Sequence, residues 1–190
     1  WSLKADQNSL ITSEKAARMI LPFFSDPDLW RLQEIRQMQK GSYLAGQAIA
    51  LAQTTLAHAL SYRLTGKNKW PHGFAVMALL PVVAKYSVMA SPNELKSSIS
   101  WSQWQSRLNL MMTVLNLKTH EEIPEYFKNL FLKWCPTEMV SQLQQLQLER
   151  NHIEIWVEES SQRNSRADNY PCLLNKTKLK VMNLFKFDVL

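Results

Sequence analysis

Glycine is scarce in this sequence, at four residues in 190. An all-β chain needs glycine in its tight turns, and a phosphate-cradling loop needs several close together so that the backbone can approach the ligand. Four scattered glycines supply neither. The sequence is instead rich in Leu, Gln, Lys, Met and Ala, which favour helices. With 46% hydrophobic residues the chain can bury a core, so we expect an all-α protein.

Cysteine is also scarce. The only two, Cys135 and Cys172, do not form a CxxC pair. A zinc ribbon and a redox dithiol are therefore disfavoured, because both use closely spaced cysteines. We expect two free, partly buried thiols in a reducing compartment.

Long apolar runs are missing as well. The best candidate, residues 74–84, ends at Lys85 and is shorter than the roughly 18 residues of a membrane span. The first residues lack the basic-then-apolar order of a signal peptide. These features predict a cytoplasmic protein with no membrane partner. Trp1 stands where an initiator methionine would, so we expect the sequence to begin inside a longer polypeptide.

Positive charge exceeds negative charge, and the formal net charge is +6. A basic chain raises the question of a nucleic-acid partner. The densest basic stretches, residues 63–69 and 176–180, are not interleaved with aromatic residues as a base-stacking surface would be. A solvated basic surface explains them better. We expect no nucleic-acid partner, and a basic nucleic-acid module is kept only as an alternative that filter binding would test.

Hydrophobic periodicity and turn residues divide the sequence into expected helices. The first covers residues 9–24 and is followed by a turn with a good N-cap. The second is one long helix over residues 29–60. Its second half, residues 45–52, is small and apolar on all sides, which predicts complete burial. Further helices are expected over residues 74–89, 99–115, 124–134, 136–150 and 176–185.

Two other segments have a different pattern. Residues 160–170 are polar and predict a loop. Residues 153–157 could form a strand, but no second strand is expected to pair with it. The organisation that follows is a single helical-bundle domain over residues 1–190.

Two histidines, His58 and His72, could carry chemistry. His58 lies near the end of the long apolar helix, and His72 stands between Pro71 and Gly73 at the start of the next helix. A helix–loop–helix return between them can bring both rings to one point. Imidazole is the commonest protein ligand of divalent transition metals, and two imidazoles need added oxygen ligands to complete a site. The residues alone leave open whether these histidines are ligands or structural side chains.

The other two histidines, His120 and His152, lie beside glutamates in polar surroundings. We expect both on the surface, with no metal role.

The segments around His58 and His72 form a specific pattern. It consists of A-G-x-A, then H-A, then P-H-G-x-A fourteen positions after the first histidine, then L-L-P. This pattern resembles the C-terminal domain of the iron-containing (group III) alcohol dehydrogenase family in order, spacing and flanking residues. The matching segments here are residues 45–48, 58–59, 71–75 and 79–81.

The resemblance covers essentially the whole chain, although residues 85–159 match only in their expected helical structure and not in specific motifs. Residues 166–171 resemble the family's R-x-x-N-N-P, with Tyr170 in place of the second asparagine. The residues at 54–55 and 61–65 look closest to the branch that acts on phosphonate aldehydes and alcohols.

The resemblance implies a two-domain oxidoreductase. Family members join an N-terminal dinucleotide-binding domain to a helical domain. They hold a divalent iron or zinc ion with four ligands: an aspartate, a second residue that is histidine or glutamine, and two further histidines. His58 and His72 match those two histidines, whereas the Asp and its partner would lie upstream of Trp1. Many members have another histidine four residues after the first. Here that position is Tyr62, which could donate a proton instead or pack as a core tyrosine.

The resulting prediction is the metal-binding C-terminal half of an NAD(P)-dependent alcohol dehydrogenase or aldehyde reductase, inactive by itself. A small alcohol or aldehyde and NAD(P) would be used only by a longer parent protein. The alternative is a non-catalytic helical remnant or interaction domain with structural histidines. Self-association into a homo-oligomer through an exposed apolar face is also considered. If the histidines are ligands, their nearest nitrogens should lie within about 6 Å of each other.

Overall fold

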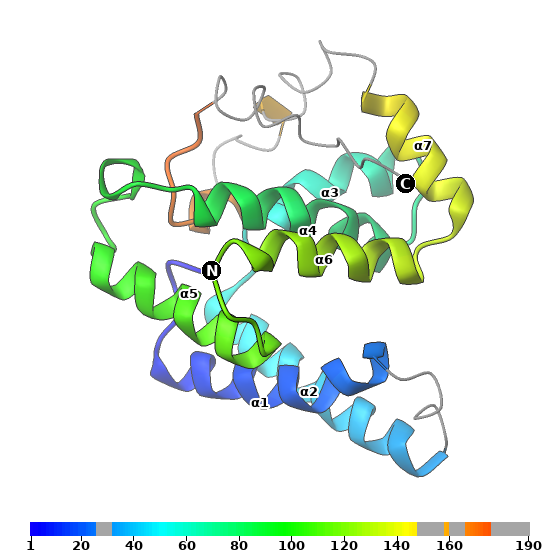
Figure 1. The fold of residues 1–190 in the computed structure, drawn as a ribbon, viewed down its shortest axis with the longest axis horizontal. Coiled ribbons are helices and arrows are strands. Elements are labelled where there is room, and N and C mark those ends of the chain that lie inside the picture. The colour runs from blue at the N-terminus through cyan, green and yellow to red at the C-terminus, as the bar shows by residue number, and fades with distance from the viewer. Residues whose placement is uncertain (26–31, 148–157, 160–165, 176–190) are drawn as a thin grey trace.

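The computed structural model describes residues 1–25, 32–147, 158–159 and 166–175, and these residues are mainly helical (Figure 1). No β-strand occurs among them, apart from an isolated bridge between Leu95 and Cys172. The predicted all-α class is therefore confirmed. The α-helices are α1 (Gln7–Ser25), α2 (Leu32–Ala52), α3 (Leu56–Gly66), α4 (His72–Val88), α5 (Trp101–Leu115), α6 (Glu122–Trp134) and α7 (Thr137–Gln147). The short 3-10 helices are η2 (Pro92–Glu94) and η3 (Arg166–Asn169).

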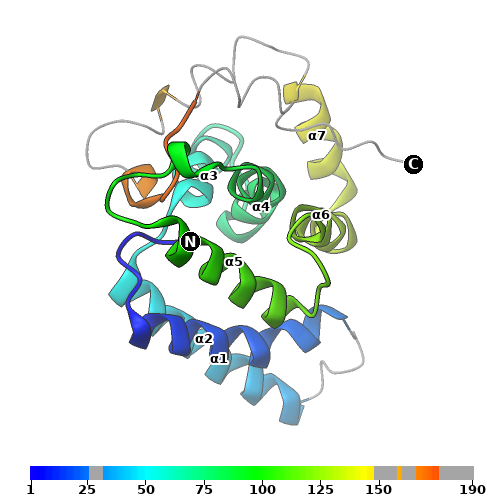
Figure 2. The ribbon, with the colours of Figure 1, turned by 60° about the vertical axis from the view of Figure 1, so that its left-hand side comes forward.

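The helices form two layers. Helices α1 and α2 pair as an antiparallel hairpin, and α4 packs against α3 and α6 in the second layer. Figure 2 shows α5 lying between the hairpin and the α3–α4–α6 layer. The direct packing of α1 outside its own hairpin is mainly with α5. The α1–α2 hairpin therefore has only a small area of direct helix packing with the rest of the described molecule.

Helix α4 is the centre of the core. Its buried residues occupy every side of the helix over its last three turns, as expected for a helix that is apolar all round. Trp104 and Phe131 pack into the same cluster from α5 and α6. Both cysteines are free, and both are buried. None of the described helices is long and apolar enough to cross a membrane.

The predicted single helix over residues 29–60 is wrong. Helix α2 ends at Ala52 and α3 begins at Leu56. Between them Gln53 adopts a left-handed conformation with φ of 59°, and Thr55 is extended. This break has a tertiary cause, because the carbonyl groups of Ala52 and Thr54 accept hydrogen bonds from the distant Asn169.

The predicted burial of residues 45–52 is also wrong. Ala48 is buried, but Ile49 and Leu51 are 47% and 54% exposed. Helix α2 packs chiefly on α1, and the side chains of Ile49 and Leu51 are not covered by this contact.

The predicted loop over residues 160–170 is corrected in its last part. Residues Arg166–Asn169 form η3, and Asn169 and Tyr170 are buried. The apolar helix expected from residue 74 begins earlier, at His72. The helix expected over residues 176–185, the strand considered at 153–157 and His152 all lie outside the described residues.

Candidate metal centre

The return of the chain between α3 and α4 brings His58 close to His72. His58 is in the first turn of α3, and His72 is the first residue of α4. The connecting segment runs back along α3, because the amide of Trp70 donates to the carbonyl oxygen of Leu64 at 3.2 Å. The buried indole of Trp70 holds this return and donates to Gln142 Oε1 at 2.7 Å. The two histidines therefore depend on a well-anchored connection.

The rings of His58 and His72 are in contact. Their centroids are 5.3 Å apart, and the ring planes make an angle of 62°. Tyr62, one turn after His58, lies nearly parallel to the ring of His72 with a centroid distance of 6.4 Å. Three rings from two helices thus form one cluster. Tyr62 is 52% exposed, so the alternative of a packed core tyrosine is wrong.

The electrostatic surroundings favour a neutral His58. Burial of the half-buried ring lowers its pKa, and the nearby His72 and the positive charge of Arg166 lower it further. His72 is exposed. A neutral imidazole keeps a nitrogen lone pair available to a cation, which a protonated ring does not.

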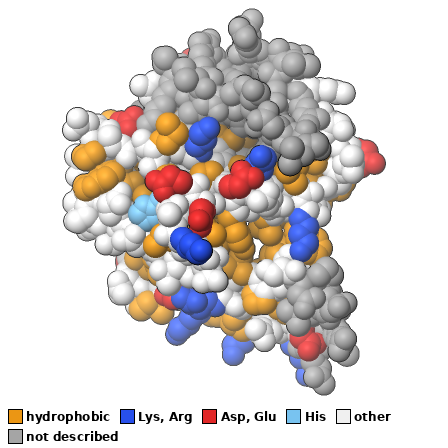
Figure 3. All heavy atoms as spheres, viewed as in Figure 1, with side chains coloured by type: hydrophobic (Ala, Val, Ile, Leu, Met, Phe, Trp, Pro, Cys, Tyr) orange, Lys and Arg blue, Asp and Glu red, His pale blue; other side chains and the backbone are white. Residues whose placement is uncertain are grey.

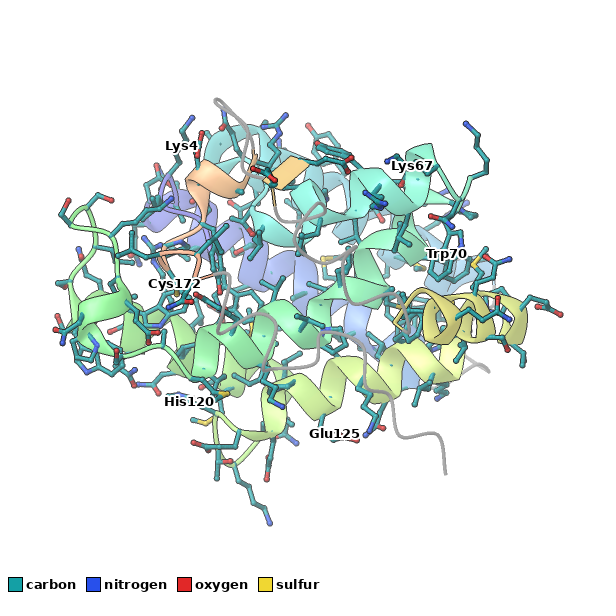
Figure 4. All side chains as sticks on the ribbon, turned by 90° about the horizontal axis from the view of Figure 1, so that it is seen from above. Lys4, Lys67, Trp70, His120, Glu125 and Cys172 are labelled. Atoms are coloured by element: carbon teal, nitrogen blue, oxygen red, sulfur yellow. The ribbon has the colours of Figure 1, made fainter. Side chains whose placement is uncertain are left out.

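The remaining potential ligands do not join this pair. Within the described segments, no group of three or more His, Cys, Asp and Glu side chains is placed to hold a metal ion. His120 bonds through Nε2 to Asn109 Oδ1 at 2.7 Å and is partly exposed, in agreement with its predicted surface position. Figure 4 shows His120 well away from Lys67 and Trp70, which lie at the α3–α4 connection.

The corner between α2 and α3, residues 52–55, leads into His58. It is hydrogen-bonded to Asn169, a residue with no role predicted from the sequence. Asn169 Nδ2 donates to Ser2 Oγ at 2.7 Å, to the Ala52 carbonyl at 2.8 Å and to the Thr54 carbonyl at 3.2 Å. Its Oδ1 accepts from the amide of Lys4 at 3.1 Å. Asn169 is 6% exposed. The only signal in the sequence was its position in the R-x-x-N-N-P resemblance, which carries no indication of these partners.

Comparison with known proteins identifies the family. Residues 28–186 match the model of the Fe-containing alcohol dehydrogenase family, C-terminal. The chain belongs to this family.

Two curated relatives are similar over part of the chain. The 1,3-propanediol dehydrogenase of Klebsiella pneumoniae is 40% identical over 63 residues, which cover 33% of this chain and 16% of that protein. The enzyme of the same name from Citrobacter freundii is 38% identical over 63 residues, with the same coverage.

Two solved structures share the fold. A 1,3-propanediol oxidoreductase superposes with a TM-score of 0.70 at 23% identity, over 96% of this chain and 46% of that one. The sulfoacetaldehyde reductase from Bifidobacterium kashiwanohense in complex with NAD+ gives a TM-score of 0.72 at 22% identity, over 99% and 46%. The chain spans about half the length of these solved proteins.

Proposed function

We propose that this chain provides His58 and His72 as two ligands of a divalent iron or zinc site in an NAD(P)-dependent alcohol dehydrogenase or aldehyde reductase. The observation that carries the proposal is the contact between the two rings on separate helices. Membership of the iron-containing family supports the same chemistry. We further propose that the chain is a helical metal-binding domain of a two-domain oxidoreductase and is inactive by itself.

The donor set fits such an ion. Imidazole nitrogens bind both zinc and iron, and two rings bound to one ion at ~2.1 Å at a tetrahedral angle have centroids roughly 5 Å apart. The centroids of His58 and His72 are 5.3 Å apart. The lowered pKa of His58 keeps that ring in the neutral form that binds a cation.

Two imidazoles do not complete the site. The described residues bring no third ligand to it, so we propose that oxygen ligands, including an aspartate as in the family, come from outside the described residues. When bound, the ion would polarise an alcohol or aldehyde oxygen, and NAD(P) would exchange the hydride. The residues of this chain hold and orient the site.

Tyr62 is proposed as a proton donor beside the site. Its ring stacks on that of His72, and the residue is half exposed. The relatives are named for 1,3-propanediol and sulfoacetaldehyde, and a small alcohol or aldehyde is therefore the proposed substrate class.

Titration with Co²⁺, followed by calorimetry and visible absorption, tests the metal site. The chain should bind one ion weakly, and both His58→Ala and His72→Ala should reduce affinity at least tenfold. His120→Ala is the matched control, because its ring bonds to Asn109 instead. Equal binding by all four proteins would reject the site. If His58→Ala changed only the melting temperature, the histidines would be structural.

A further inference from the structure

The turn that leads into His72 contains a single buried residue. Residues 67–71 connect α3 to α4, and Trp70 is 3% exposed, whereas the other residues of this connection are exposed. Lys69 adopts the left-handed conformation with φ of 58°, which is unfavourable for most side chains. The local sequence therefore does not favour this turn by itself, and the burial of the Trp70 indole stabilises it.

The position of His72 depends on this turn. As the first residue of α4, His72 has no preceding helical turn, and Pro71 at the N-cap has no polar side chain that could cap the helix. Pro71 joins Trp70 to His72 with φ fixed at −55°. The exposed ring of His72 contacts the rings of His58 and Tyr62, which both lie on α3. A displacement of Trp70 would therefore move His72 relative to His58.

The indole of Trp70 is bound by a residue of another helix. Trp70 Nε1 donates a hydrogen bond of 2.7 Å to Oε1 of Gln142, which lies on α7, 72 residues further along the chain. Leu143 is buried in the core, and Met139 and Val140 pack against the same core cluster. Figure 4 shows Trp70 next to α7. The acceptor of the indole N–H thus belongs to a helix that is itself packed against the core.

The hydrogen bond between Trp70 and Gln142 joins two uncharged groups. Glu138 is the one charged residue in the sequence of α7, whereas Figure 3 shows charged side chains of both signs over the region of α6, the preceding helix. Salt screens interactions between charges, and neither an indole nor an amide titrates between pH 5 and 8. The effect of this hydrogen bond on His72 should therefore be the same at low and at high ionic strength.

We propose that Gln142 is a positioning residue of the candidate metal centre, which holds Trp70 and thereby sets the place of His72 beside His58. Without its acceptor, the buried indole N–H would be unpaired, and the ring would turn toward water to regain a partner. This movement would pass through Pro71 to His72 and separate the two imidazoles. The effect on metal binding rests on the proposed function, whereas the position of His72 in the metal-free protein does not.

Gln142→Leu tests the link, because it removes the acceptor with little change in size. Gln145→Leu makes the same change at another exposed position of α7 and is the matched control. In imidazole NMR spectra of the metal-free 190-residue chain, Gln142→Leu should shift the resonances of His72 at least threefold more than those of His120. Gln145→Leu should leave both histidines unchanged. An unmoved His72, or equal shifts in the two variants, would overturn the proposal.

Two further variants separate positioning from a general effect on stability. Gln142→Glu keeps an oxygen acceptor at the same distance from the backbone and should restore the wild-type resonances of His72. In a Trp70→Phe background there is no indole N–H, so Gln142→Leu should cause no further shift of His72. If the Trp70→Phe protein does not fold, the comparison of Gln142→Glu with Gln142→Leu decides. Failure of Gln142→Glu to restore the resonances, or a full shift in the Trp70→Phe background, would overturn the positioning role.

Co²⁺ titration measures the consequence for the proposed metal site. Residues that hydrogen-bond directly to a metal ligand typically change metal affinity about 10- to 100-fold. Gln142 acts through two intervening residues, so Gln142→Leu should weaken Co²⁺ binding by about three- to tenfold and Gln142→Glu by less than about twofold.

The two readouts distinguish this inference from the metal proposal. Unchanged affinity in Gln142→Leu, in a protein whose Co²⁺ binding depends on His58 and His72, would overturn the role of Gln142. A shift of His72 in metal-free Gln142→Leu, in a protein whose Co²⁺ affinity does not depend on the histidines, would reject the metal site and retain the positioning of His72.

Discussion

Replacing Asn169 by alanine should destabilise the protein strongly, because this side chain ties together three separate segments. It donates to Ser2, Ala52 and Thr54 and accepts from Lys4. A hydrogen bond contributes about 0.5–1.5 kcal/mol net, and a buried group left without its partner costs about 1–3 kcal/mol. The amide has two protons for three acceptors, so the contributions are not fully additive. We expect the free energy of unfolding to fall by about 2–4 kcal/mol.

Urea unfolding monitored by circular dichroism measures this loss, with an unchanged m-value as the sign that compactness is retained. Asn129→Ala, at an exposed position of α6, is the matched control and should change stability by no more than about 0.5 kcal/mol. In the folded fraction of Asn169→Ala, the imidazole resonances of His58 should also shift, because the corner preceding α3 loses its support. A loss below about 1 kcal/mol, or an unmoved His58, would refute this reasoning about the corner.

Further predictions follow from other positions. Gly41→Ala should destabilise the hairpin by about 1–3 kcal/mol, because the new Cβ would lie 2.7 Å from Ile20 Cγ1 and 3.1 Å from Met19 Cβ. Gly46→Ala, where a Cβ meets nothing within 4 Å, should stabilise the protein by about 0.5–1 kcal/mol in the same urea assay. The pKa of His58 is lowered in the folded state, so the unfolded state binds more protons. The contribution of His58 to the free energy of unfolding is thus complete above pH 6.5, which is the ordinary pKa of a histidine. It is lost as the pH falls through the pKa of the folded state. Urea titrations from pH 7.5 to 5 should show a flatter profile for His58→Gln, and an identical slope would contradict the assignment. Calorimetry with NADH should give no micromolar binding to this chain, because its four scattered glycines provide no phosphate-cradling turn.

The helices that could be predicted from the sequence are those whose signals are local. The periodicity and turn residues near Ser100 and Asn116 mark the bounds of α5, where the structure has a capping box and a left-handed C-cap. The spacing of His58 and His72 likewise predicted that their rings lie close together, and the two rings are in contact.

The helix break at residues 53–55 could not be predicted in this way. Its local sequence continues the pattern of a helix, and the carbonyl groups it frees are satisfied by a side chain more than a hundred residues away. The exposure of Ile49 and Leu51 has a similar origin, because periodicity gives the apolar faces of a helix but not which faces receive a neighbour. Both differences were decided by tertiary packing.

The link between Asn169 and Ser2 joins positions separated by 167 residues. Such a contact has a high entropic cost of loop closure, and contacts of this kind form late in folding. The same asparagine supports the corner that leads into His58. We therefore expect the helices to form before the histidine pair is fixed. During synthesis on the ribosome, the pair should remain unassembled until residues 166–169 have left the exit tunnel.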